Sequence, residues 1–196
     1  MAAPRIRPFR GGDESHVFDV CVRTGHGDPA MLADVYAAPY LLFDPTLVFV
    51  VDTGERVAGY ILGTADTREF VRRYRAEWLP AFAARHEMPA EVPDDAPAEG
   101  PHGVLAAGLH PERMLVPGVD EYPAHLHIDL LPELQRQGLG RMLVQTFADA
   151  LRARGVRGLH LVADPANTSA IAFYSRLGFV ALPAEPEVGA LMGMRL

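Results

Sequence analysis

Apolar and polar positions in the first third of the chain follow patterns typical of short strands and amphipathic helices. Glycines and a polar cap separate these segments, and the turn residues Thr53-Gly54-Glu55 favour a hairpin between the last two. The expected elements are a strand over Arg5–Arg10, a helix from a cap at Asp13 to about Thr24, a short helix over Ala30–Ala38, and strands over Leu47–Asp52 and Val57–Thr64.

The middle of the chain begins with a longer helical pattern. Phe70, Tyr74, Trp78 and Phe82 recur every four residues and form one aromatic stripe, which favours core packing over a platform for a ligand. Residues Met88–Pro101 are crowded with proline and acidic side chains and are expected to form an exposed loop. We interpret this helix and loop, at about 66–119, as an insertion within a single domain that spans residues 1–196.

Strand and helix patterns alternate regularly in the last third of the chain. Gly155 and Gly178 are natural helix stops, and the alternation implies parallel pairing and a layered α/β domain. The expected elements are a strand over His125–Leu131, a helix with Leu139, Met142, Leu143, Thr146, Phe147, Ala150 and Leu151 on its inner face, a strand over Gly158–Ala163, a helix over Thr168–Leu177, and strands over Phe179–Leu182 and Met192–Leu196.

Composition narrows the classes of protein to consider. A length of 196 residues with 49% hydrophobic residues suits a folded domain, and the net charge of −7 argues against nucleic-acid binding. The longest apolar stretches, such as Leu47–Val51, fall well short of the roughly 20 residues needed to cross a bilayer. The N-terminus lacks the apolar run of a signal peptide. We therefore expect a cytoplasmic protein whose partners include neither nucleic acid nor a membrane.

The chain has one cysteine, Cys21. A single cysteine excludes an internal disulfide and a multi-cysteine zinc site. Because Cys21 sits among apolar residues of the first expected helix, a buried small side chain is favoured over a nucleophile.

The segment Gln135–Arg141, with the sequence QRQGLGR, is the most informative in the chain. It joins an expected strand to an expected helix, so its backbone N–H groups lie at the positive end of the helix. Gly138 and Gly140 let the backbone approach an anion such as a pyrophosphate closely. On this stretch alone, an ordinary strand-to-helix turn is an equally good interpretation.

A specific resemblance to a known family rests on two segments taken together. Ile128–Arg141 has the order strand, (Q/R)-x-x-G-x-(G/A), helix, and Asn167–Phe179 reads NTSAIAFYSRLGF. In this order they resemble the GNAT superfamily of acetyl-CoA-dependent N-acetyltransferases, and Ile6–Phe9 fits the usual opening of that family. The run Tyr122–Ile128 and the aromatic helix are similar to the acetyltransferase-like domain appended to O-GlcNAcase. The resemblance implies a mixed central sheet that is splayed between two parallel strands and flanked by helices.

The resemblance also implies acetyl-CoA as co-substrate and assigns residues to it. Backbone amides over 136–141 would bind the pyrophosphate, with Arg136 or Arg141 adding a charge-assisted contact. The pantetheine arm would pair with the strand around Leu130, where a backbone N–H would polarise the thioester carbonyl. Asn167 would bind the amide arm of the cofactor, cap its helix, or do both. The expected cofactor-binding residues are Leu130, Leu131, Gln135, Arg136, Gln137, Gly138, Leu139, Gly140, Arg141, Asn167 and Tyr174.

Catalytic roles follow from the same resemblance and from proton chemistry. Tyr174 matches the family tyrosine that gives a proton to the departing thiolate, and a phenol of pKa about 10 suits a thiolate whose conjugate acid has a pKa near 8.5. An amine acceptor must lose a proton before it attacks. His125, His127 and Asp129 alternate with apolar residues and share one face of their strand. These three side chains are therefore candidate bases, directly or through water, with His127 and Asp129 taken as the catalytic pair beside the candidate acid Tyr174. A polar face without a catalytic role is equally compatible with the pattern.

The resemblance thus implies an N-acetyltransferase that moves an acetyl group from acetyl-CoA to a primary amine by direct attack in a ternary complex, without a metal. The sequence does not identify the acceptor, which could be a protein N-terminus, a lysine, an aminoglycoside, a polyamine or an amino sugar. It does not fix the oligomeric state either, although a homodimer is compatible with the resemblance. The main alternative is an acetyl-CoA-binding module with little or no transferase activity.

Two other enzyme classes fit less well. The spacing of His125, His127 and Asp129 resembles that of metal ligands, as in a metal hydrolase, but the remaining histidines form no second cluster in the sequence. A dinucleotide-binding oxidoreductase would need a third glycine after Gly138 and Gly140 and an acidic residue on the next strand.

Overall fold

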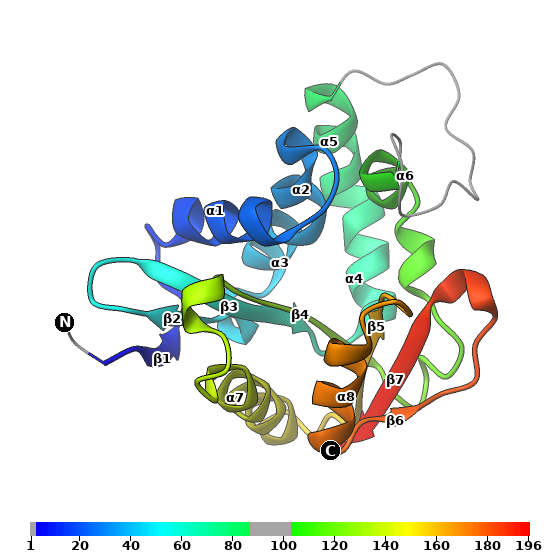
Figure 1. Ribbon diagram of the computed structural model, residues 1–196. Helices are drawn as coiled ribbons and strands as arrows, with labels where there is room; N and C mark the ends of the chain where they lie inside the picture. The colour runs from blue at the N-terminus through cyan, green and yellow to red at the C-terminus, as the bar shows by residue number, and fades with distance from the viewer. Residues whose placement is uncertain (1–2, 87–102) are drawn as a thin grey trace.

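One mixed sheet of seven strands organises the chain. The structure, a computed structural model, describes residues 3–86 and 103–196, so the expected loop Met88–Pro101 lies outside the described residues. The strand order is β1-β2-β3-β4-β5-β7-β6, in which β4 and β5 are parallel and the other neighbours are antiparallel (Figure 1). The strands are β1 Arg5–Pro8, β2 Phe49–Asp52, β3 Val57–Thr64, β4 Ala124–Leu130, β5 Gly158–Ala163, β6 Val180–Ala181 and β7 Ala190–Arg195.

Helices cover both faces of the sheet (Figure 1). Helices α1 to α6 lie on one face, and α7 and α8 lie on the other. The helices are α1 Glu14–Thr24, α2 Pro29–Tyr36, α3 Ala38–Phe43, α4 Thr67–Arg73, α5 Leu79–Arg85, α6 Gly103–Leu109, α7 Leu139–Ala153 and α8 Thr168–Arg176, with a π-helical turn, Tyr74–Trp78, between α4 and α5. None of the helices in the described residues combines the length and the apolar character needed to cross a membrane.

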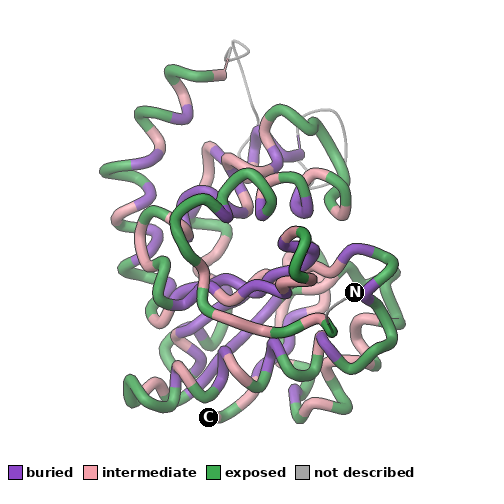
Figure 2. The backbone as a smooth tube through the Cα atoms, turned by 90° about the vertical axis from the view of Figure 1, so that its left-hand side faces the viewer, coloured by how far each residue is buried: buried purple, intermediate pink, exposed green. Residues whose placement is uncertain are grey.

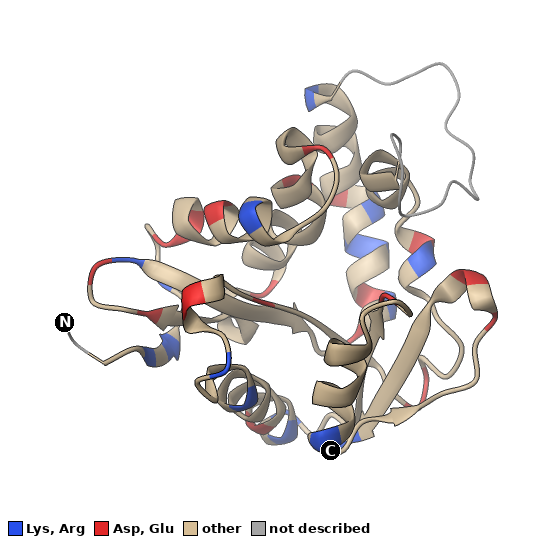
Figure 3. Cartoon of the chain, viewed as in Figure 1, with Lys and Arg blue, Asp and Glu red and all other residues tan. Residues whose placement is uncertain are grey.

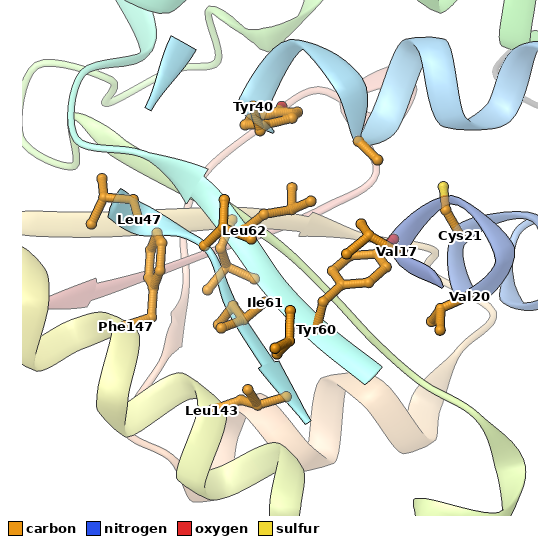
Figure 4. Packing of buried hydrophobic residues seen from close by; sticks show 14 of the residues in the cluster. Val17, Val20, Cys21, Tyr40, Leu47, Tyr60, Ile61, Leu62, Leu143 and Phe147 are labelled. Carbon is orange, nitrogen blue, oxygen red and sulfur yellow. The ribbon is translucent and has the colours of Figure 1, made fainter. Parts of the chain in front are cut away.

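The core lies on both sides of β3, whose eight residues are all buried. Figure 4 shows Leu143 and Phe147 of α7 against one side of the sheet and Val17 and Val20 of α1 against the other. In Figure 2 the buried backbone accordingly runs through the middle of the molecule, while the outward faces of the helices are exposed. The strand that pairs with β3 toward the middle of the sheet is β4, so β4 is held rigidly along one edge.

The aromatic stripe is core packing, as the sequence predicts. Phe70, Tyr74, Trp78 and Phe82 are all buried. A spacing of four residues overshoots a full α-helical turn by about 40°, so a uniform α-helix would carry the stripe gradually off the core. The π-helical turn Tyr74–Trp78 takes up the extra residue and keeps the later aromatic rings on the buried face.

Asp13 occupies the N-cap position of α1, but its side chain makes no capping hydrogen bond, which corrects the expected cap. The carboxylate instead accepts two hydrogen bonds from the guanidinium of Arg7, at 2.6 and 2.9 Å, and one from the N–H of Arg10 at 2.8 Å. A bidentate bond to a guanidinium is stronger than a bond to a neutral helix N–H.

Two local expectations also need correction. The helix expected over Ala30–Ala38 ends at Tyr36, because the backbone leaves helical geometry at Ala37, and a separate helix, α3, begins at Ala38. Pro39 has no N–H with which to continue the hydrogen-bond ladder of α2. Met142, expected on the inner face of α7, is 53% exposed. The sheet instead packs against the stripe from Leu139 to Leu151 and the adjacent residues Val144 and Ala148.

The two parallel strands separate soon after they begin. β4 and β5 pair at Ala124 opposite Leu159 and at His125 opposite His160, and β4 then continues to Leu130 without β5 beside it. This confirms the predicted splay. The next strand in the chain does not extend the parallel set, since β7 lies between β5 and β6 and is antiparallel to both.

Candidate active site at the splayed strands

The main chain of β4 offers hydrogen-bonding groups to the space between the splayed strands. On the β3 side, the N–H of Leu131 donates to the carbonyl of Ala58 at 3.0 Å. Hydrogen-bonded and non-bonded pairs alternate along an antiparallel ladder. The main-chain groups of Asp129 therefore face β3, whereas those of Ile128 and Leu130 face the gap beyond the last β4–β5 pair.

The turn before α7 adopts a left-handed conformation twice. Arg136 has φ of 60° and Gly138 has φ of 81°, and the carbonyl of Gly138 accepts the N–H of Met142 as the first bond of the helix. The N–H groups of residues 138–141 have no protein acceptor among the described residues. Unpaired amides at the positive end of a helix of this length bind anions readily.

Two glutamine side chains of this turn donate hydrogen bonds to main-chain carbonyls just before it. The Nε2 of Gln135 donates to the carbonyl of Leu130 at 3.0 Å, and the Nε2 of Gln137 donates to the carbonyl of Glu133 at 2.6 Å. Basic segments lie on the turn and along α7 (Figure 3). The exposed Arg136 and Arg141 are therefore free to face an anion at the helix end.

Helix α8 lies close to the start of α7 through Phe173, in its second half. A Cβ placed on Gly140 would lie 3.2 Å from Cζ of Phe173 in α8 and 3.7 Å from Cδ1 of Leu130 in β4, so the three elements meet at this glycine. Asn167 caps α8, with Oδ1 accepting the N–H of Ala170 at 3.0 Å. The capping role expected for Asn167 is confirmed, and its side-chain NH2 is not needed for the cap.

Tyr174 projects from α8 in a partly buried setting. Its ring packs edge-on against Phe173 and Phe179, with centroid distances of 5.2 and 5.5 Å. Burial, and to a smaller degree the nearby carboxylate of Asp129, raises the pKa of Tyr174. The phenol therefore keeps its proton at neutral pH and is able to donate it.

Asp129 lies on the polar face of β4. Its Oδ2 accepts a hydrogen bond of 2.6 Å from the hydroxyl of Tyr60, which is fully buried. Burial raises the pKa of Asp129, although the bond from Tyr60 opposes this shift. A carboxylate with a raised pKa is a better proton acceptor than an ordinary one.

The two histidines of β4 converge on one hydroxyl. The Tyr40 oxygen lies 2.7 Å from Nε2 of His125 and 3.0 Å from Nε2 of His127. Nδ1 of His125 lies 2.8 Å from Oγ1 of Thr67, which in turn lies 2.8 Å from the carbonyl oxygen of Pro123. Burial lowers the pKa of His127 to about 4 and holds the pKa of His125 well below its ordinary value, so both rings are neutral at pH 7.

Sequence reasoning missed three hydroxyl residues of this site, namely Tyr40, Tyr60 and Thr67. Each of the three side chains is itself buried, and buried hydroxyls in proteins are almost always hydrogen-bonded. A tyrosine inside the expected strand Val57–Thr64 was therefore a usable signal that a polar partner had to lie nearby.

Cys21 is buried, as the sequence predicts. Its side chain is 3% exposed, and burial raises the pKa of the thiol to about 11, which leaves it without thiolate character at neutral pH. In the described part of the chain, no three side chains of histidine, cysteine, aspartate or glutamate gather as ligands for one ion.

Comparisons with known proteins agree with this architecture. The family model for the acetyltransferase (GNAT) family matches residues 23–179. Protein O-GlcNAcase of Rattus norvegicus is 23% identical over 184 residues, which cover 88% of this chain and 20% of that protein, so the chain spans about a fifth of its length.

Solved structures extend the comparison. The crystal structure of SsHAT is 44% identical with a TM-score of 0.89 and covers 99% of this chain and 98% of its own. The crystal structure of the PaiA N-acetyltransferase from Thermoplasma acidophilum in complex with coenzyme A shares the fold at 12% identity, with a TM-score of 0.60 and complete coverage of both chains.

Proposed function

The chain belongs to the acetyltransferase (GNAT) family, and on that premise we propose that it transfers an acetyl group from acetyl-CoA to a primary amine by direct attack in a ternary complex. One observation supports this most strongly. The unpaired amides at the start of α7 and the main-chain groups of Ile128 and Leu130 lie beside the gap at which β4 and β5 separate, and the phenol of Tyr174 on α8 is close enough to Asp129 of β4 to feel its charge. An elongated molecule with an anionic end suits such an opening.

The residues of the opening fit the parts of acetyl-CoA in order. The amides of residues 138–141, with Arg136 and Arg141, would hold the pyrophosphate. The main chain of Ile128 and Leu130 would pair with the amide arm in the manner of a neighbouring strand, and the NH2 of Asn167 is available to the same arm. Acetyl-CoA supplies an activated thioester. A main-chain N–H of β4 would stabilise the negative charge that develops on the thioester oxygen.

Proton transfer completes the proposed chemistry. The phenol of Tyr174, kept protonated by burial, would give its proton to the departing thiolate. The base that receives the proton of the amine would be His127 or Asp129, which share the polar face of β4. Holding the amine and the thioester together in one site would supply much of the rate.

The acceptor and the setting are proposed on broader grounds. The PaiA protein is by name an N-acetyltransferase, which favours an amine as the acceptor here too. We place the protein in the cytoplasm, where acetyl-CoA is available. A homodimer is compatible with this function and is tested by measuring the solution mass.

Thermal unfolding tests the cofactor assignment. Acetyl-CoA at about a hundred times its dissociation constant should stabilise the native protein by about 2.7 kcal/mol and raise its melting temperature by about 5–10 °C. Gly138→Asp should abolish this shift, because it places a carboxylate beside the phosphates. Gly155→Asp is the matched control, since Gly155 also has a positive φ, of 72°, and open space around its Cβ position, but lies at the other end of α7. An equal shift in both variants would place the cofactor elsewhere.

Release of free coenzyme thiol separates a transferase from a binding module. The panel of amines would comprise spermidine, glucosamine, kanamycin, a peptide with a free N-terminus and a peptide containing lysine. At least one amine should raise the release of thiol above slow hydrolysis in water. A thermal shift with no amine-dependent release would favour the module that only binds acetyl-CoA.

A further inference from the structure

A hydrogen-bonded chain joins the carbonyl of Pro123 to His127, and the direction of its first links is fixed. A carbonyl oxygen can only accept, so the hydroxyl of Thr67 donates its single hydrogen to Pro123. The same Thr67 oxygen lies 2.8 Å from Nδ1 of His125 and has no second hydrogen to give. Nδ1 of His125 must therefore carry the hydrogen of that bond.

The remaining directions follow from the neutral state of His125. A neutral imidazole carries one hydrogen, so Nε2 of His125 is bare and accepts the hydroxyl hydrogen of Tyr40 at 2.7 Å. The oxygen of Tyr40 is then the acceptor for Nε2–H of His127 at 3.0 Å. The sulfur of Met114, 3.8 Å from the same hydroxyl, is a much weaker acceptor and does not compete. His127 is thereby fixed as the tautomer with its hydrogen on Nε2.

We propose that Thr67, His125 and Tyr40 act as positioning residues that hold His127 with a bare Nδ1, and that this nitrogen receives the proton of the attacking amine. The proposal rests on the acetyl transfer described above. In that step the amine nitrogen bonds to the acetyl carbon and the carbon–sulfur bond breaks. The proton of the amine moves to Nδ1 of His127, and the departing thiolate takes a proton from Tyr174.

The chain also helps His127 to hold the proton once it arrives. His127 is only partly buried, whereas His125 is 5% exposed, so His127 is the histidine of the pair that a substrate can reach. Protonation turns the bond from Nε2 to Tyr40 into a charge-assisted one, which is stronger. Burial raises the pKa of Asp129 and lowers that of His127, so the choice of His127 rests on its fixed tautomer and its partial exposure and not on a higher basicity.

Nitrogen NMR of the unliganded protein, labelled at its 8 histidines, tests the tautomer without any need for activity. The signals of His127 are assigned by their loss in His127→Gln. We expect a hydrogen on Nε2 and a bare Nδ1 for His127, and the reverse for His125. A His127 that carries its hydrogen on Nδ1 would overturn the proposal.

Matched variants test whether the chain affects catalysis. Thr67→Val keeps the shape of the side chain but removes the hydroxyl, whereas Thr67→Ser keeps the hydroxyl. With the best amine of the panel, Thr67→Val should lower kcat at least about tenfold, leave KM for acetyl-CoA unchanged and mix the two His127 tautomers, while Thr67→Ser stays near wild type. Equal kcat values and tautomers in the two variants would contradict the proposal.

Tyr40→Phe and Tyr74→Phe form a second pair. Both tyrosines are 1% exposed, but the hydroxyl of Tyr74 has no hydrogen-bond partner among the described residues. Tyr40→Phe should lower kcat and Tyr74→Phe should not. An equal loss of kcat in both variants would mean that the loss comes from altered packing and not from the hydrogen bonds of Tyr40. A wild type that transfers no acetyl group to any amine overturns this proposal together with the proposed function, whereas a reversed tautomer in an active protein overturns this proposal alone.

Discussion

At the scale of single residues, Tyr174 carries a defined chemical prediction. Burial raises the pKa of its phenol, so the residue is fully protonated over the range in which an amine can attack. Removing the hydroxyl should lower kcat by roughly a hundredfold with little change in the affinity for acetyl-CoA, since general acid catalysis contributes about 10²–10⁴-fold. The measurement is the rate of thiol release by Tyr174→Phe. Tyr122→Phe is the control, because Tyr122 is a buried tyrosine beside Gly158 and Gly193, away from the splay. Unchanged turnover in Tyr174→Phe would remove its role as the acid.

A second residue-scale prediction concerns the ionic cluster of Arg7, Asp13 and Asp52, near the start of α1. Arg7 donates to Asp52 at 2.8 Å as well as to Asp13, and the side chains of Arg7 and Asp52 are each only 14% exposed. The bond from Arg7 lowers the pKa of Asp52 from 3.8 to about 2.

Because the folded pKa of Asp52 is depressed, its contribution to stability is complete above the unfolded pKa and is lost as pH falls from about 4 toward 2. Asp52→Asn should therefore be less stable than wild type at pH 6, and the difference in free energy of unfolding should shrink below pH 4. Urea unfolding at several pH values measures this difference. A constant difference down to pH 2 would show that the charge of Asp52 is not what stabilises the fold.

Residue-scale expectations from the sequence succeeded where the partner is close along the chain. The cap of α8 by Asn167 was predictable, since its acceptor and the N–H of Ala170 are three residues apart. Asp13 was placed correctly at the start of α1 but given the wrong partner, because Arg7 comes from the preceding strand. The bonds of Tyr40 to two histidines 85 and 87 residues away left no pattern that the sequence could reveal.

At the scale of elements, the helical segment from α4 to α5 depends on its π-helical turn. Deleting the exposed Ala76 would restore an ordinary α-helix. The side chains that follow it in this segment would then be rotated by about 100° around the helix axis. Trp78 would lose its hydrogen bond of 2.9 Å to the carbonyl of Asp34, and Phe82 would leave the core. We expect a loss of at least about 3 kcal/mol, comparable to truncating a large buried aromatic residue.

Urea unfolding checks this expectation, with Ala76→Ser as the control that keeps the length of the segment. If the deletion variant is as stable as Ala76→Ser, the turn does not hold the aromatic stripe in place. The comparison is informative because position 76 itself is exposed and contributes little packing.

Elements with strong local patterns were predictable, but their neighbours in the sheet were not. The strands β4 and β5 and the helices α7 and α8 follow from periodicity and glycine stops. The position of β7 between β5 and β6 depends on pairs such as Leu161 opposite Met192, which are far apart in the chain. Helix α3 was missed because Pro39 interrupts an apolar run without marking which side of it is helical.

At the scale of the whole molecule, the splay divides the sheet into two parts that meet only at the start of β4 and β5. The family resemblance predicted this opening, which composition and periodicity alone did not. Its proposed use as a site depends on features from both parts, with β4 on one side and α8 beside β5 on the other. A ligand in the opening would therefore add contacts that the sheet itself lacks.

Amide hydrogen exchange tests this arrangement residue by residue. The N–H of Asp129 faces β3 and should be protected in the free protein, whereas those of Ile128 and Leu130 face the gap and should exchange much faster. Saturating acetyl-CoA should slow exchange at Ile128 and Leu130 and leave Asp129 nearly unchanged, because only the first two gain a hydrogen-bond partner. In Gly138→Asp the same concentration should protect neither, which ties the protection to the anion site at α7. If Ile128 and Leu130 are as protected as Asp129 before any ligand is added, the gap is already closed by protein and the proposed path of the cofactor is wrong.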